Sequence, residues 1–119
     1  MDADPIEGQV LVLTAAKASV PPARLPQLVD RGQAHLREER EHYRHEYERI
    51  HADERVEAFL VPDGHWDGLG AKLELRDREL SALCRAHNEQ FHRIGRRVDR
   101  EQEFETALEI RDPVLIGRE

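Results

Sequence analysis

Apolar residues between Asp77 and Val98 recur with the spacing of a helix that packs along another helix. The recurring positions, separated by 4, 3, 4, 3 and 4 residues, are Leu80, Cys84, His87, Phe91, Ile94 and Val98. This a/d spacing predicts a helix over 77–98 with one buried face, whose centre is Phe91 and Ile94. Asp77 is the expected N-cap, because its side chain can accept hydrogen bonds from the first free N–H groups. The pattern constrains architecture and says little about chemistry.

A second long helix is predicted over Arg24–His51. Its apolar face is formed by Leu25, Val29, Gly32, Leu36, Tyr43, Tyr47 and Ile50. The register of this face skips one position, near Glu39 or Arg40. We expect an antiparallel pairing of this helix with the helix over 77–98, at the centre of the fold.

A shorter helix is predicted before these two, ending near Ala18. The segment Asp4-Pro5-Ile6-Glu7 reads as an N-cap, a proline at the first helical position and a capping-box carboxylate. The helix that follows is apolar nearly all round, so we expect it to be buried as a cap on the core.

The remaining segments predict a small antiparallel β element formed by residues 55–61 and 104–116. Arg55–Val61 is rich in strand formers and ends at the turn Pro62-Asp63-Gly64. Trp66, Leu69 and Leu73 are spaced as in a short helix, whereas Phe104, Thr106, Leu108 and Ile110 alternate as in a strand. Asp112-Pro113 is expected to turn the chain into a second strand over 114–116. The fold class is therefore mainly α, in a single domain over 1–119.

Composition limits the classes of partner. Charged residues make up 36% of the 119 positions and the net charge is -7, which disfavours binding to nucleic acid or to an anionic membrane. No segment reaches the ~20 apolar residues of a membrane helix, and the residues before Gln9 lack the positive charge of a signal peptide. We therefore expect a cytoplasmic protein.

The two long apolar faces exceed what one short helix can cover, which favours a homodimer. Cys84, the single cysteine, is expected to be a small buried residue.

The segment Leu69–Leu83 resembles helix-turn-helix DNA-binding proteins. The residues that carry this resemblance are Leu69, Gly70, Leu73, Leu75, Leu80 and Leu83. The predicted order of elements from Arg24 to Gly117 is also that of a winged helix. The resemblance implies that the groove-facing residues are Arg76, Arg78, Ser81, Ala82 and Arg85. The chain departs from the family at Glu74, where a turn glycine is usual, and in a second helix about two turns too long for a recognition helix. A purely structural helical corner is the alternative interpretation.

Four arginines, Arg93, Arg96, Arg97 and Arg100, share one face of the same helix, opposite its apolar positions. Their guanidinium groups could together hold phosphates or an acidic protein partner. The alternative is a solvated face on which the arginines pair with carboxylates, and Glu89 lies on that face.

Histidine and glutamate alternate along one flank of the second helix. His35, Glu39, His42 and Glu46 follow i, i+4, i+7 and i+11, and Glu39 and His42 have the Glu-x-x-His spacing of carboxylate-bridged metal bundles. A metal site is one hypothesis for this ladder, although a full set of inward-facing ligands from several helices is missing. His87 lies on the apolar face and is expected to be a hydrogen-bonded core histidine.

No motif supports nucleophilic catalysis or nucleotide binding, so we expect no enzymatic activity and no cofactor. The segments Phe59-Leu60-Val61-Pro62, His65-Trp66 and 105–110 resemble small uncharacterised proteins of halophilic archaea. The leading hypothesis is a self-associating protein-protein interaction module. The alternatives are a winged-helix-like DNA-binding regulator and a metal-binding helical protein.

Overall fold

Within residues 5–118, which the computed structural model describes, six helices surround a small antiparallel sheet. The elements follow in the order α1 (Gly8–Ala18), α2 (Arg24–Glu38), α3 (Arg40–Glu46), β1 (Glu48–Ala52), β2 (Val56–Pro62), α4 (His65–Lys72), α5 (Asp77–Arg97), α6 (Glu101–Ala107) and β3 (Arg111–Gly117). The prediction of a mainly α fold with a small antiparallel β element is confirmed. No helix in the described part of the chain has the length and apolarity needed to cross a membrane.

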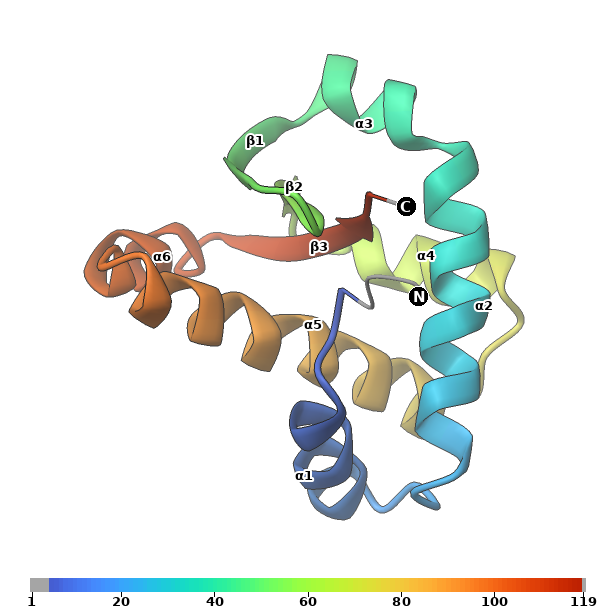
Figure 1. The fold of residues 1–119 in the computed structure, drawn as a ribbon. Coiled ribbons are helices and arrows are strands. Elements are labelled where there is room, and N and C mark those ends of the chain that lie inside the picture. Colours follow the sequence, from blue (N-terminus) through green and yellow to red (C-terminus); the bar gives the residue numbers. More distant parts are fainter. Residues whose placement is uncertain (1–4, 119) are drawn as a thin grey trace.

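The sheet has the strand order β1-β2-β3, with β2 antiparallel to both neighbours. Helix α5 runs beneath the sheet, α3 lies above it, and α1 packs on the far side of α5 (Figure 1). All residues of β2 from Val56 to Val61 are buried, because helices cover both faces of this central strand. This burial explains why the strand reads as a continuous apolar run interrupted only by Glu57.

The order of helices and strands is compatible with a winged-helix-like layout. A helical segment precedes the first strands, α4 and α5 form two consecutive helices, and β3 returns to the sheet after them. One difference concerns the β-hairpin. The hairpin here is β1-β2 and precedes α4, whereas β3 joins the sheet as a single strand.

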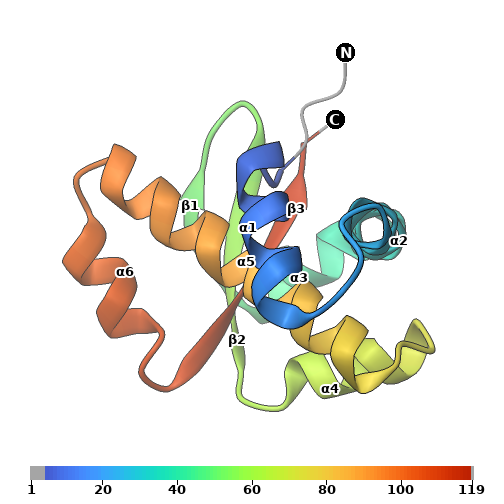
Figure 2. The ribbon, with the colours of Figure 1, turned by 90° about the horizontal axis from the view of Figure 1, so that it is seen from below.

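The two long helices cross steeply instead of pairing lengthwise. In Figure 1 α2 stands upright beside α5, and in Figure 2 α2 is viewed along its axis while α5 lies across the picture. The apolar face of α5 is nevertheless buried, with Phe91 0% and Ile94 6% exposed. It packs on β3, α1 and α6, and the ring of Phe91 stacks on Phe104 of α6 at 4.4 Å between centroids. The predicted burial of Phe91 and Ile94 is confirmed, but the face is covered by the sheet and short helices.

The predicted helix over 24–51 was too long. Helix α2 ends at Glu38, Glu39 adopts φ -98° and ψ 9°, and α3 continues in a new direction to Glu46. This break lies where the apolar register skips a position. It allows Tyr43 to reach Phe59 on the sheet, at 5.8 Å between ring centroids. Beyond α3 the chain forms β1, because pairing with β2 outweighs the local helical pattern.

The predicted strand over 104–110 and turn at Asp112-Pro113 were also wrong. Residues Glu101–Ala107 form α6, since Phe104 must point inwards to stack on Phe91 and lie against Gly95, where a Cβ would meet its ring at 2.9 Å. Asp112 and Pro113 belong to β3 and pair with Val61 and Leu60. Proline is tolerated there because β3 is an edge strand.

Helix α1 starts later and is more exposed than its sequence predicts. The expected N-cap, Asp4, lies outside the described residues, and the helix begins at Gly8 with Glu7 as its N-cap. Glu7 is extended because its N–H donates to Oε1 of Gln90 at 2.9 Å, tying the chain to α5. Val12 and Leu13 are 63% and 53% exposed, so α1 is not buried between other elements. The apolar faces of α2 and α5 are covered within the chain, which removes the original reason for expecting a dimer.

Candidate functional site

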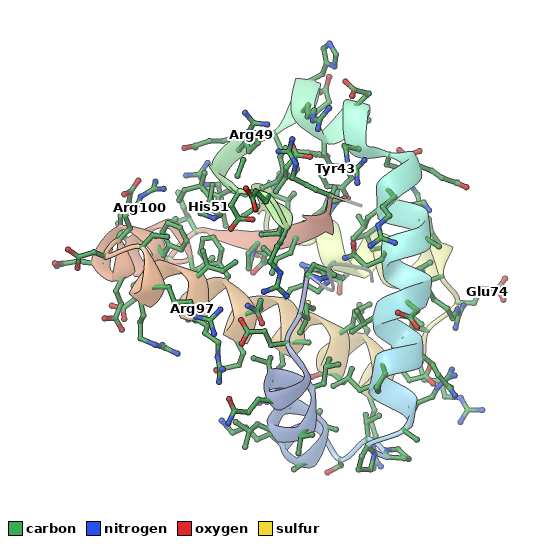
Figure 3. All side chains as sticks on the ribbon, viewed as in Figure 1. Tyr43, Arg49, His51, Glu74, Arg97 and Arg100 are labelled. Carbon is green, nitrogen blue, oxygen red and sulfur yellow. The ribbon has the colours of Figure 1, made fainter. Side chains whose placement is uncertain are left out.

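The helix-turn-helix-like corner is formed by α4 and α5. Leu75 donates its N–H to the C=O of Gly70 at 2.9 Å, and a Cβ on Gly70 would meet Leu80 at 2.8 Å, so the helices approach closely at this glycine. Glu74 adopts φ 57°, the left-handed conformation for which helix-turn-helix proteins usually employ glycine. Its side chain projects away from the molecule (Figure 3). Glu74 thus adopts the left-handed conformation at the position where the resemblance expects a turn glycine.

Helix α5 begins one residue earlier than its predicted cap suggests. Arg76 is the N-cap, and its N–H donates to Oε1 of Glu79 at 3.0 Å. The predicted groove-facing residues Arg76, Arg78, Ser81 and Arg85 are exposed, whereas Ala82 is buried. No side chain among residues 5–118 pairs with those of Arg78 and Arg85. These arginines are thus available for an external partner.

Helix α1 lies beside part of this arginine-bearing surface. It packs on the side of α5 that faces away from the sheet, as both ribbon views show (Figures 1 and 2). Arg85 lines a small hollow together with Thr14 and Lys17 of α1. A DNA duplex approaching Arg85 would therefore meet α1 as well.

Most of the predicted arginine stripe is engaged within the chain. Arg93 and Arg97 both bind the carboxylate of Glu7, while Arg100 binds Glu103 at 2.8 Å. Arg97 lowers the pKa of Glu7 to about 2, and its hydrogen bond to the carboxylate is the largest cause. Arg96 alone of the four has no hydrogen-bond or ion-pair partner among the described side chains. The stripe therefore anchors α1 and α6 more than it presents a free phosphate-binding surface.

A second arginine cluster, which the sequence analysis did not identify, surrounds the buried Glu57. Arg44 donates from Nε to Oε2 at 2.9 Å and from Nη2 to Oε1 at 2.8 Å, and Arg49 donates to Oε2 at 2.8 Å. The guanidinium groups of Arg40 and Arg118 lie 3.5 Å and 4.0 Å from the same carboxylate. These arginines come from α3, β1 and the segment after β3, so Glu57 ties three parts of the chain together.

The charge of Glu57 is maintained by this cluster. Burial on its own raises the pKa of a carboxyl group, but the hydrogen bonds from Arg44 and Arg49 outweigh it and hold the pKa of Glu57 below its usual range. A glutamate within an otherwise apolar strand was the available sequence signal. The positions of its arginine partners were not foreseeable from spacing.

The predicted histidine-glutamate ladder is interrupted by the break at Glu39. His35 and Glu39 remain on α2 and at its end, whereas His42 and Glu46 belong to the redirected α3. No group of three or more His, Cys, Asp or Glu side chains in the described residues is arranged to hold a metal ion. The geometry therefore gives no support to the metal-binding hypothesis.

Three ladder residues instead share a pocket of about 300 Å³ with groups from α4. This pocket, which we call the α2–α4 pocket, is lined by His35, Glu39, His42, Tyr43, Tyr47, Gly64, His65, Gly68, Leu69 and Lys72. Four of the lining rings form one cluster, in which Tyr43 lies 5.1 Å from Tyr47 and 5.5 Å from His65 between centroids, and His42 lies 6.1 Å from Tyr47. Glu46 is not part of the pocket.

Tyr43 and His65 are joined by a hydrogen bond of 2.5 Å between the phenol oxygen and Nε2. Burial raises the pKa of Tyr43, so the phenol keeps its proton at neutral pH. Burial, together with the charges of Lys72 and His42, lowers the pKa of His65, so the imidazole is neutral. The phenol therefore donates to Nε2 and the proton of His65 resides on Nδ1. Tyr43 points from α3 towards the interior (Figure 3).

The polar side chains at the rim of the pocket have no hydrogen-bond or ion-pair partner within the described chain. Glu39 and Lys72 form no ion pair, either with each other or with another described residue, and His35 and His42 form no side-chain hydrogen bond there. A pocket that combines an aromatic wall with several unpaired polar groups is typical of small-molecule sites.

A family model of a domain of unknown function (DUF8048) matches residues 4–118. The chain belongs to this family. No curated protein and no solved structure matches it. Family membership thus covers almost the whole chain and assigns no activity, so functional arguments depend on the geometry of this fold.

Proposed function

We propose that this chain is a small non-enzymatic protein-protein interaction module that self-associates through α1. The supporting observation is the pair of adjacent exposed side chains Val12 and Leu13, which are 63% and 53% exposed. The other large apolar residues exposed on the described part of the chain, Val98 and Ile110, are isolated near the ends of α5 and α6. Neighbouring exposed apolar groups mark interaction surfaces more often than scattered ones do.

The exposed pair belongs to a continuous face of the helix. The exposed residues on this face are Gln9, Val12, Leu13, Ala16 and Lys17, at i, i+3, i+4, i+7 and i+8. The opposite face carries Val10, Thr14 and Ala15, which are buried against the rest of the protein. Helix α1 is therefore firmly attached on one side and apolar on the other, as an interface helix requires.

A second copy of the chain is the partner that this face fits best. The face has an apolar centre, with Gln9 at one end and Lys17 at the other, so a two-fold axis through Val12 and Leu13 brings like apolar groups together. The two helices would then lie antiparallel. This arrangement pairs opposite ends of the helix dipoles.

The solution mass as a function of concentration tests this proposal. We expect light scattering to approach twice 13.8 kDa at high micromolar concentration. Leu13→Arg should return the mass to that of the monomer, whereas Ile110→Arg, at an exposed apolar residue elsewhere, should leave the dimer intact. Melting temperatures close to that of the parent protein would show that both variants fold. A monomer mass at every concentration, in low and high salt, would refute self-association.

DNA binding is the second candidate, favoured by the left-handed Glu74 and the close approach of α4 and α5 at Gly70. Arg78 and Arg85 would then contact phosphates or bases. Two features weigh against it, namely the position of α1 beside Arg85 and the net charge of -7. Duplex binding that Arg85→Ala weakens separates the two candidates.

The resemblance to halophilic archaeal proteins leads to a further proposal, that the protein functions at high salt. Surface ion pairs such as those of Arg100 with Glu103 are then screened and contribute little. A melting temperature that rises steeply with potassium chloride would support this proposal, and one that falls would contradict it.

A further inference from the structure

The α2–α4 pocket lies apart from the α1 surface, and its two ends carry different chemical groups. Its two ends are fixed by contacts between elements. Arg31 of α2 donates a hydrogen bond to the C=O of Leu73, so the C-terminal end of α4 lies beside α2. Tyr43 bonds to His65, so the N-terminal end of α4 lies beside α3. Lys72 and His35 therefore belong to one end of the pocket, and the ring cluster to the other.

The space in the pocket is preserved by a glycine that the fold does not otherwise require. Gly68 lies within α4, where glycine is a poorer helix former than alanine. A Cβ built on Gly68 would meet no atom within 4 Å, so close packing does not explain the residue. Gly64, by contrast, has φ 93° and is required by its backbone conformation. A side chain at position 68 would project from the pocket wall.

The positive charge of Lys72, at one end of the pocket, is not paired with a carboxylate among the described residues. Lys72 is one of only two lysines in a chain with 25 acidic and 18 basic residues, yet it forms no ion pair among the described residues. Glu39, one helical turn beyond His35, also remains unpaired. Its negative charge disfavours an anion in the middle of the pocket and places one at the Lys72 end.

We infer that the α2–α4 pocket binds a small planar carboxylic acid, with its carboxylate on Lys72 and His35 and its ring against Tyr47 and His42. The ammonium group and the imidazole N–H supply charge-assisted hydrogen bonds to a carboxylate. The half-buried ring of Tyr47 and the exposed ring of His42, 6.1 Å apart between centroids, offer faces and edges to a planar ligand. A volume of about 300 Å³ fits a ligand of one ring and is at the small end of known sites.

Titration calorimetry with three probes tests both features of the ligand. Benzoate has a ring and a negative charge, benzamide is its neutral isostere, and acetate has the charge without the ring. We expect benzoate to bind with a Kd on the order of 1 mM or tighter. Benzamide and acetate should each bind about 10-fold more weakly, because each lacks one of the two interactions.

Two substitutions locate the binding. Lys72→Gln should weaken benzoate binding about 10-fold, whereas Lys17→Gln, at the only other lysine, should leave it unchanged. Gly68→Leu should abolish binding, because its side chain fills the pocket, while the melting temperature stays equal or rises since leucine is the better helix former. If Gly68→Leu unfolds the protein, the comparison of Lys72→Gln with Lys17→Gln still tests whether benzoate binds in the pocket.

Equal affinity for benzoate and benzamide would overturn the inference, as would equal effects of the two lysine substitutions. Failure of benzoate to bind at tens of millimolar would do the same. Zinc binding that depends on His35 and Glu39, without benzoate binding, would replace the carboxylic acid by a metal ion. Self-association through Val12 and Leu13 is measured separately, so neither result determines the other.

Discussion

The backbone N–H of Leu115 donates a hydrogen bond to Nδ1 of His87 over 3.0 Å, at the outer edge of β3. Gln33 bonds to the C=O of Leu115 and the N–H of Gly117, both at 2.8 Å, and Trp66 donates to the C=O of Pro113 at 3.1 Å. Side chains from three helices thus take the place of a fourth strand. This edge of the sheet is therefore closed to pairing with another chain.

The bond to His87 makes stability depend on pH. His87 is buried, and burial lowers its pKa to about 3 from an ordinary value of 6.5. The unfolded chain therefore binds a proton at higher pH than the folded chain does. The stabilisation that neutral His87 gives to the folded state is fully present above pH 6.5 and is lost as the pH falls towards 3. We expect a decrease of about 2–3 kcal/mol in the free energy of unfolding between about pH 7 and 4, measured by urea titration.

His87→Asn is the matched control for this effect. The amide oxygen can accept the Leu115 N–H in place of Nδ1 and does not titrate. The variant should be less stable at neutral pH, but its stability should change little over the upper part of the same range. A parent protein with constant stability between about pH 7 and 5 would contradict the assignment. Below this range, protonation of Glu7 also contributes, because its pKa is lowered to about 2.

Phe91→Ala tests the core between α5 and α6. Phe91 is fully buried and stacks on Phe104, so its removal leaves a cavity that the rigid sheet cannot close. The expected loss is about 3–5 kcal/mol in denaturant titration. Leu13→Ala, at an exposed apolar position, should cost less than about 1 kcal/mol in the monomer. A loss below about 1 kcal/mol for Phe91→Ala would show that this site is not part of the core.

Glu57→Gln tests the arginine cluster above the sheet. The substitution keeps the shape of the side chain but removes the charge that Arg44 and Arg49 neutralise. We expect a loss of about 2–3 kcal/mol, below the full value for a buried pair because the arginines remain partly in contact with water. Glu103→Gln, which removes an exposed partner of Arg100, should leave the free energy of unfolding almost unchanged. Equal losses in the two variants would contradict the anchoring role of Glu57.

The sequence predicted those elements whose local pattern and tertiary contacts agree. Helix α5 has a strong apolar repeat, and β2 has a run of strand formers ending at a clear turn, so both were placed within about two residues. Residues 40–52 were misassigned because their direction is set by distant groups. Tyr43 and Arg44 must reach Phe59 and Glu57 on β2. Residues 104–110 alternate like a strand, yet Phe104 is positioned by Phe91.

The candidate pocket could be predicted only in part, for the same reason. His35 and Glu39 lie one turn apart on α2 and at its end, so their proximity follows from periodicity. His42 belongs to the redirected α3, so its place beside them does not. His65 and Lys72 come from α4, which follows a hairpin, and no spacing rule connects them with Tyr43. The exposure of Val12 and Leu13 was also missed, because the pattern of an apolar helix does not tell how many neighbours cover it.

Duplex DNA is the main alternative to a protein partner. If α4 and α5 act as a DNA-binding corner, Arg78 and Arg85 contact phosphates, and log affinity falls with log salt by about 0.9 per contact. Arg100 lies beyond the C-terminal end of α5, is bound to Glu103 and would not take part. Because the net charge is -7 and α1 lies beside Arg85, we expect no submicromolar binding at physiological salt in fluorescence anisotropy. Submicromolar binding that Arg85→Ala weakens and Arg100→Ala does not would replace the interaction module by a helix-turn-helix regulator.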